Sequence, residues 1–144
     1  MTRARRLQPV GQLMDELERE SALRVAATQA RLADARRRHT ELQQYLDEYR
    51  QMFEQRARAG MGVSGVRDYQ VFIARLREAV QAQQSVVEQL TTECEAEREA
   101  WQQAAARKNA VSRVIEHART EERRAEDRRQ QQELDERAQR QGAP

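Results

Sequence analysis

The sequence contains few of the residues that interrupt helices or build a broad core. Its 144 residues include two prolines and five glycines, and aromatic residues make up only 4% of the chain. Three of the glycines fall within residues 60–65, so the segments on either side are free to form long helices. The scarcity of aromatic residues disfavours a wide globular core, whereas abundant Ala, Glu, Gln, Arg and Leu are typical of a coiled coil.

Cysteine, charge of one sign and long apolar runs are also scarce. Cys94 is the only cysteine, which excludes an internal disulfide bond. The net charge of +2 provides no broad basic field, and the arginines within residues 3–6 and 36–38 are interpreted as solvated surface. No signal peptide is recognised, and no apolar run is long enough to span a membrane. We therefore expect a cytosolic protein without stable membrane insertion and without a nucleic-acid partner.

The stretch from Val66 to Ala118 has apolar residues at nearly every step of an alternating three-and-four spacing. This spacing is the signature of a coiled-coil helix. It argues against disorder, which is the other reading of a charged chain with few aromatic residues. So narrow a stripe needs a partner helix to bury it. Its positions are Val66, Tyr69, Ile73, Leu76, Val80, Gln83, Val87, Leu90, Cys94, Glu97, Trp101, Ala104, Lys108, Val111, Ile115 and Ala118.

A second apolar pattern precedes the glycines and predicts a helix from about residue 9 to about residue 58. Pro9 fits the first turn of this helix, and residues 1–8 are expected to form a frayed basic segment. Spacing within the stripe is strict from Val25 onward. Two steps of four through Ser21 precede Val25, and they predict a stutter in the repeat. The positions upstream of the stutter are Val10, Leu13, Met14 and Leu17.

The glycine-rich segment 59–65 predicts a short turn between the two helices. Ser64 is expected to cap the second helix, which runs from about 65 to about 138. The turn forces the two helices to lie antiparallel. Residue i of the first helix then lies near residue 124 − i of the second, to within a few residues. The first helix is then too short to cover residues 119–141. The predicted fold is all-α, a long two-helix antiparallel coiled-coil hairpin with an overhanging C-terminal helix, in a single domain spanning 1–144.

No set of residues predicts catalysis, a cofactor site or a metal site. His39 and His117 belong to different helices, and Cys94 has no metal-ligating neighbours in sequence. Residues 60–65 spell G-x-G-x-x-G, the pattern of a dinucleotide-binding turn. That motif requires a preceding strand, and here a charged helix precedes it. We therefore predict a protein that is not an enzyme.

Several of the few aromatic residues gather near the predicted turn. Tyr45 and Phe72 lie beside the heptad stripe, and Tyr49 lies close to them in sequence. The pairing rule places Tyr45 near Ala79 and Phe72 near Met52. One interpretation is a thickened core at the end of the hairpin. The interpretation we favour is an exposed apolar face for protein contact, since two helices offer no third layer to cover these rings.

Short motifs along the chain resemble a known family. Tyr45 and Tyr49-Arg50 close the first helix ahead of Gly60, and Trp101 lies in the second helix. The specific parts are Tyr69-Gln70-x-Phe72-Ile73-x-x-Leu76-x-x-Ala79-Val80, Ala125-Glu126-x-Arg128 and Asp135-Glu136-x-Ala138-Gln139-Arg140. Over essentially its whole length, the sequence resembles the FliJ family of flagellar type III export.

This resemblance implies a cytoplasmic stalk similar to that of rotary ATPases, placed at the inner-membrane export apparatus. The implied partners are the flagellar export ATPase hexamer and the cytoplasmic region of the export gate, with export chaperones as a further class. The implied gate patch is Leu42, Tyr45, Tyr49, Phe72, Leu76 and Ala79. The implied ATPase-facing end, formed by both termini together, includes Arg124, Arg128, Asp135, Glu136 and Arg140.

Two departures concern the rim of the gate patch. Arg38 and Gln83 occupy positions at which some relatives have Gln and His. Two other functions stay open on the sequence. One is the equivalent stalk of a virulence-type type III secretion system, and the other is a generic coiled-coil tether.

Overall fold

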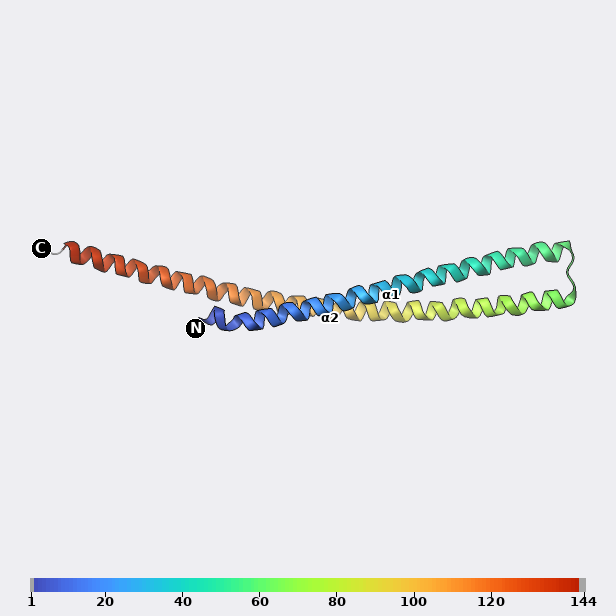
Figure 1. Cartoon of the computed structure of the whole chain (residues 1–144), viewed down its shortest axis with the longest axis horizontal. Coiled ribbons are helices and arrows are strands. Elements are labelled where there is room, and N and C mark those ends of the chain that lie inside the picture. Colours follow the sequence, from blue (N-terminus) through green and yellow to red (C-terminus); the bar gives the residue numbers. More distant parts are fainter. Residues whose placement is uncertain (1, 143–144) are drawn as a thin grey trace. The chain divides into compact units, whose positions relative to one another are not determined.

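A computed structural model describes residues 2–142 and contains two helices (Figure 1). Helix α1 spans Arg3–Ala59 and helix α2 spans Val63–Gly142, and no strand occurs among the described residues. The two helices pack against each other in antiparallel directions, as the contacts between early residues of α1 and late residues of α2 require. The predicted all-α architecture is confirmed.

Helix α1 begins earlier than the sequence pattern indicates. The backbone N–H of Arg5 donates to the Thr2 hydroxyl over 3.3 Å, so that Thr2 caps the helix. Ala4 is buried, and the helix therefore has a packing reason to include this first turn. Pro9 lies inside the helix instead of in its first turn, at a cost of about 3 kcal/mol in a typical helix interior. The expected frayed segment before Pro9 is therefore wrong.

The turn occupies only residues 60–62. Gly60 has φ of 101°, a left-handed conformation that ends α1 and that a side chain would strain. The N–H of Val66 donates to the carbonyl oxygen of Gly62 over 3.1 Å, which places Gly62 at the start of α2. Ser64 lies within the first turn of α2, so its predicted role as the cap is wrong.

The chain divides into two compact units, each containing a segment of both helices. Unit 1 comprises Met1–Ala22 with Ala100–Pro144, and unit 2 comprises Leu23–Glu99. Within each unit, α1 and α2 meet along a row of residues that we call the seam.

The seam of unit 2 is apolar and follows the predicted stripe. Its central cluster is Leu32, Ala35, Leu90 and Cys94, with Val87 packed against them. Gln83 is the polar exception, and its Nε2 donates to the carbonyl oxygen of Ala35 across the seam over 3.0 Å. Because this contact satisfies a polar group at the seam, the apolar row can continue past it.

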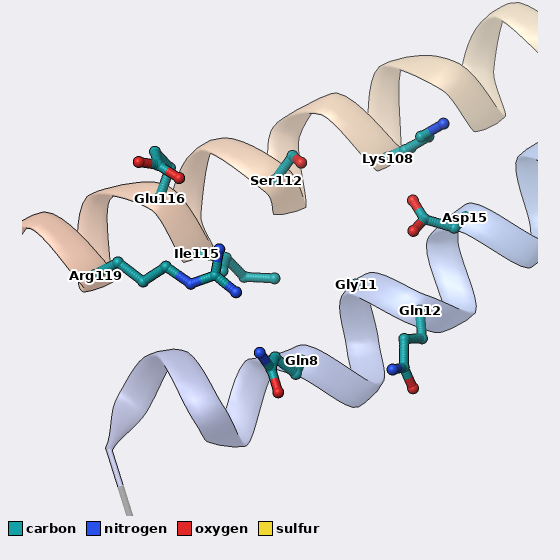
Figure 2. A pocket seen from close by; sticks show the side chains of 9 residues that line it. All are labelled: Gln8, Gly11, Gln12, Asp15, Lys108, Ser112, Ile115, Glu116 and Arg119. Carbon is teal, nitrogen blue, oxygen red and sulfur yellow. The ribbon is translucent and has the colours of Figure 1, made fainter.

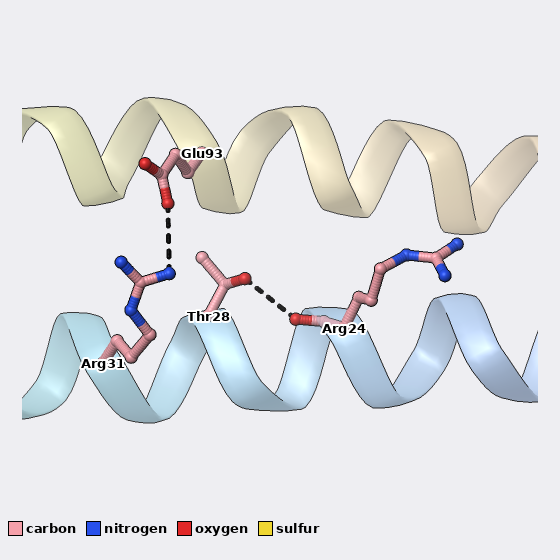
Figure 3. Close-up of polar contacts among 4 residues, drawn as sticks. All are labelled: Arg24, Thr28, Arg31 and Glu93. Atoms are coloured by element: carbon pink, nitrogen blue, oxygen red, sulfur yellow. Dashed lines mark hydrogen bonds and ion pairs between the residues drawn. The ribbon is translucent and has the colours of Figure 1, made fainter.

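Two polar contacts accompany this seam, one within α1 and one between the helices (Figure 3). The buried Thr28 hydroxyl donates to the carbonyl oxygen of Arg24 over 2.8 Å, one turn back in the same helix. The Arg31 guanidinium lies 3.4 Å from the Glu93 carboxylate of α2. Arg31 and Glu93 follow the predicted rule of 124 − i, and both are exposed, so the pair contributes little stability.

The seam of unit 1 follows residues that the apolar pattern does not indicate. Its α1 positions continue the strict spacing upstream of Val25 without a stutter, and the predicted stutter is therefore wrong. The sequence pattern followed large apolar residues, whereas several seam positions hold small or charged ones. The seam positions of α1 in unit 1 are Ala4, Leu7, Gly11, Met14, Glu18 and Ser21, of which three are small and Glu18 is charged.

Gly11 brings the helices close together in unit 1. The Ile115 side chain of α2 extends toward Gly11 (Figure 2), and a Cβ added to Gly11 would lie 2.9 Å from Ile115 Cδ1. A glycine on the seam therefore accommodates the end of a large side chain from the facing helix.

A polar cluster follows along the same seam. Glu18 Oε1 accepts a hydrogen bond of 3.0 Å from Trp101 Nε1, and Glu18 Oε2 lies 3.7 Å from Lys108 Nζ. Ser21 is only 2% exposed, and its hydroxyl has no hydrogen-bond partner among the described residues. A buried hydroxyl without a partner costs stability. Among the described residues, unit 1 buries Ala4, Ile115 and Ala118, whereas unit 2 buries more and mostly larger apolar side chains.

Candidate functional site

The turn end of unit 2 carries an aromatic cluster, which we define as Tyr49, Phe53, Tyr69 and Phe72. The rings of Tyr49 and Phe72 have centroids 4.6 Å apart and an interplanar angle of 55°. Those of Phe53 and Tyr69 are 5.6 Å apart at 46°. Such tilted pairs contribute about 0.5–1.5 kcal/mol each beyond their buried area. The cluster therefore ties α1 to α2 close to the turn.

The aromatic cluster also forms a surface. Tyr49, Tyr69 and Phe72, together with Asp68, line a hollow of about 330 Å³. The Phe72 side chain is 41% exposed although it contacts Tyr49. The rings therefore combine both readings of the sequence, since they pack against each other and still present apolar area to a partner.

The six residues of the implied gate patch are only partly brought together. Tyr49 and Phe72 touch, and Leu42, Leu76 and Ala79 are half-buried along the packed helices. Tyr45 is 53% exposed and lines a separate hollow with Glu41, Gln44 and Glu48 of its own helix. The predicted proximity of Tyr45 to Ala79 stays a prediction.

Sequence reasoning missed three members of the surface around the cluster. Tyr69 was predicted as a position of the apolar stripe, and neither Phe53 nor Asp68 was assigned to a surface from the sequence. The Arg56 guanidinium carbon lies 5.8 Å from the Tyr69 ring centroid, within the range of a cation–π contact. Phe53 and Tyr69 lie at nearly equal numbers of residues before and after the turn. That spacing could have predicted from the sequence that the two rings meet.

The far end of α2 is the second candidate surface. Among the described residues, the last hydrogen bond between α2 and α1 is donated by the N–H of Ala4 to Glu122 Oε1 over 3.1 Å. Every residue of 123–142 is helical and exposed, and we call this stretch the free segment. Because α1 starts early, it covers more of α2 than the sequence indicated. All five residues of the implied ATPase-facing end lie on the free segment.

Side chains of the free segment contact each other along the helix. Arg129 Nη2 lies 2.7 Å from Glu126 Oε1, and Gln131 Nε2 donates to Asp135 Oδ1 over 3.2 Å. Exposed pairs of this kind contribute a few tenths of a kcal/mol each. The helix therefore presents alternating charges to solvent along its whole surface.

The two histidines belong to different units. His39 is half-buried in unit 2, whereas His117 is exposed in unit 1, where its Nε2 lies 3.1 Å from Glu121 Oε1. Residues 2–142 contain no group of three or more His, Cys, Asp or Glu side chains placed to hold a metal ion. The G-x-G-x-x-G pattern forms the turn and the start of α2, and helix α1 precedes it where a strand is required.

In residues 2–142 we find no helix with the length and apolar character needed to cross a membrane. Comparison with curated proteins gave no significant match, and comparison with solved structures gave none either. The family model for the flagellar FliJ protein matches residues 3–143, nearly the whole sequence. The chain therefore belongs to the FliJ family of flagellar export proteins.

Proposed function

We propose that this protein is a non-enzymatic coupling stalk of the flagellar type III export apparatus. In this role the free segment contacts the export ATPase hexamer, and the surface around Tyr49 and Phe72 contacts the cytoplasmic region of the export gate. The protein would act at the inner membrane without inserting into it. Export chaperones are a third proposed partner class, to which no residues are assigned. The observation that carries the proposal is the free segment, in a chain whose family functions in flagellar export.

The chemistry of the free segment suits a polar partner. Residues 123–142 contain six arginines and five acidic residues, and Leu134 is the one large apolar side chain. Most of the stability of a helix in a protein comes from tertiary packing, and every residue of the free segment is exposed. Contact with a partner would stabilise the helix, and Arg124, Arg128 and Arg140 can form charge-assisted hydrogen bonds there.

The aromatic surface suits the second proposed contact. Phe72 and Tyr45 together expose aromatic area, and aromatic anchors supply much of the binding energy in protein interfaces. Tyr49 supports the Phe72 ring from the facing helix, so that part of the surface is already ordered before binding. Arg38 and Gln83 line another hollow with Val86, and we place them at the rim of the proposed gate contact.

The ATPase contact is tested by ending the chain after Glu122, which keeps every contact described between α1 and α2. We expect the full chain to raise ATP hydrolysis by the cognate export ATPase and to promote its hexamer, and the shortened chain to do neither. The chain alone should hydrolyse no ATP. Thermal unfolding followed by circular dichroism checks that the shortened chain is folded. Equal stimulation by both chains would overturn the assignment of the free segment.

The gate contact is tested with the double variant Tyr45→Ala and Phe72→Ala. We expect weaker binding to the isolated cytoplasmic region of the gate, measured by calorimetry, with helicity retained. Tyr45→Ala alone is the sharper probe, because Tyr45 is 53% exposed, more than Phe72 at 41%. Leu23→Ala is the matched control, since Leu23 is exposed in the same unit. Loss of helicity without a specific loss of binding would favour the core-packing interpretation.

A further inference from the structure

The seam of unit 1 has two flanks of opposite character. One flank is polar: Gln8 and Asp15 of α1 lie across from Ser112 and Arg119 of α2, around a hollow of about 310 Å³ (Figure 2). The other flank, which we call the apolar flank, holds large apolar side chains that remain exposed. Its members are Val10, Leu13 and Leu17 of α1 and Ala110 and Val114 of α2.

The seam geometry places these residues on one side. Val10 directly precedes Gly11, and Val114 directly precedes Ile115, the residue that faces Gly11. In an antiparallel pair, residues that precede facing seam positions lie on the same flank. The same relation holds in unit 2, where Arg31 precedes Leu32 and Glu93 precedes Cys94, and Arg31 contacts Glu93.

The exposed apolar area on this flank is continuous along α1. Val10, Leu13 and Leu17 follow each other at helical spacing, which makes a single row on the helix surface. Their exposures are 41%, 50% and 42%, and Val114 is 44% exposed. Single exposed apolar residues are ordinary, but a row with a counterpart on the facing helix marks an interaction surface.

Arginines outnumber carboxylates along the apolar flank, where Glu20 precedes the seam residue Ser21. Arg3 and Arg6 continue the row of α1 beyond Val10, and Arg107 precedes the seam residue Lys108 on α2. Within residues 2–142, these three guanidinium groups form none of the ion pairs present. Glu121 on this flank already contacts His117. Arginines without carboxylate partners favour a ligand with negative charge at its edges.

We propose that the apolar flank of unit 1 binds an amphipathic helix of another protein, with an apolar stripe and acidic edges. Such a helix would lie along α1 and α2 as a third strand of the coiled coil, and its acidic edges would meet Arg3, Arg6 and Arg107. A second copy of this chain fits less well, because it would juxtapose two surfaces on each of which arginines outnumber carboxylates. The surface is separate from the free segment, and the proposal goes beyond the coupling role.

The test uses the full chain and two labelled synthetic peptides of about three heptads, with identical leucine stripes. One peptide carries Glu at its edge positions, and the other carries Lys. Binding is measured by fluorescence anisotropy. We expect the acidic peptide to bind, with affinity that falls as salt increases, and the basic peptide not to bind.

Two sets of variants locate the site. Leu13→Gln with Leu17→Gln should weaken acidic-peptide binding by about tenfold or more, because two apolar contacts are lost. Leu23→Gln with Leu134→Gln is the matched control, with the same change at exposed leucines elsewhere, and should change binding by less than about twofold. Arg6→Gln with Arg107→Gln should weaken binding and reduce its salt dependence.

Three outcomes would overturn the proposal. They are equal binding of both peptides, unchanged binding by the Leu13 and Leu17 variant, and a wild-type dimer that this variant abolishes. If the variant loses helicity, methyl NMR of the wild-type chain decides the question. The acidic peptide should then shift the methyl signals of Val10, Leu13, Leu17 and Val114 while leaving Leu134 unchanged.

Discussion

Units 1 and 2 share the same three-and-four seam spacing but fill it with different residues. Unit 2 places Leu, Ile and Val at most positions, whereas unit 1 places Gly11, Glu18 and Ser21 there. In α1 of unit 1, Val10, Leu13 and Leu17 lie one position off the seam and are exposed. In unit 2 the apolar pattern of the sequence therefore marks residues that pack between the helices. In the α1 part of unit 1 the same pattern marks mainly residues exposed on the surface. Stability should therefore reside in the unit 2 seam.

The largest effect is expected from Leu90→Ala, which removes a buried side chain of the unit 2 cluster. We expect a loss of about 2–5 kcal/mol in the free energy of unfolding, because a cavity forms between the helices. Leu17→Ala, at a half-exposed site in unit 1, should cost less than about 1 kcal/mol. Urea unfolding followed by circular dichroism measures both. Similar losses at the two sites would contradict the distinction between the units.

The next effect is expected from Glu18, the charged seam residue of unit 1. Glu18→Ala should lower the free energy of unfolding by about 1–2 kcal/mol, because Trp101 loses its acceptor and Lys108 loses its counter-charge. Glu18→Leu should recover much of this loss, since an apolar seam residue often replaces a charged one without cost. The exposed Glu16→Ala is the control. If Glu18→Leu is less stable than Glu18→Ala, the polar cluster stabilises unit 1 more than apolar packing would.

The two halves of α1 also differ in how far the sequence predicted them. Downstream of Val25 the stripe of α1 could be read directly, because large apolar residues on it, such as Leu32 and Leu46, are buried. Upstream of Val25 it could not, since Gly11 and Glu18 have the wrong size and polarity for a seam. Their placement depends on Ile115 and Lys108 of the facing helix, which no local pattern in α1 reveals.

The candidate site was predicted with similar limits. The pairing rule brought the aromatic residues to one end of unit 2, but it placed Phe72 near Met52, whereas the Phe72 ring packs on Tyr49. Successive helical residues point about 100° apart, so an error of a few residues in the pairing changes which side chains meet. A sequence rule can therefore locate such a cluster but not its contacts. The early start of α1 depends on burial of Ala4, which the sequence of that segment does not indicate.

A smaller effect is expected from Gly11→Ala. Alanine favours a helix over glycine by about 1 kcal/mol, but its Cβ would force Ile115 Cδ1 to move. We expect a net gain of a few tenths of a kcal/mol in the wild-type background. In the Ile115→Val background, which lacks Cδ1, Gly11→Ala should raise the free energy of unfolding by close to the full difference of about 1 kcal/mol in helix propensity. A double-mutant cycle from urea unfolding measures the coupling. No coupling between the two sites would mean that the close approach imposes no constraint.

The smallest effect is expected from the ion pair between Arg31 and Glu93 in unit 2. Both side chains are more than half exposed, at 65% and 53%, whereas the Glu18 side chain that pairs with Lys108 in unit 1 is only 17% exposed. Water and salt screen the exposed pair, and Glu93→Gln should change the free energy of unfolding by less than about 0.5 kcal/mol. Lys108→Gln should cost more, because Glu18 would then keep its charge at the seam with only Trp101 as a partner. Measuring both variants at low and high salt separates the two cases. A larger loss for Glu93→Gln would show that surface charge, rather than the apolar seam, gives unit 2 its stability.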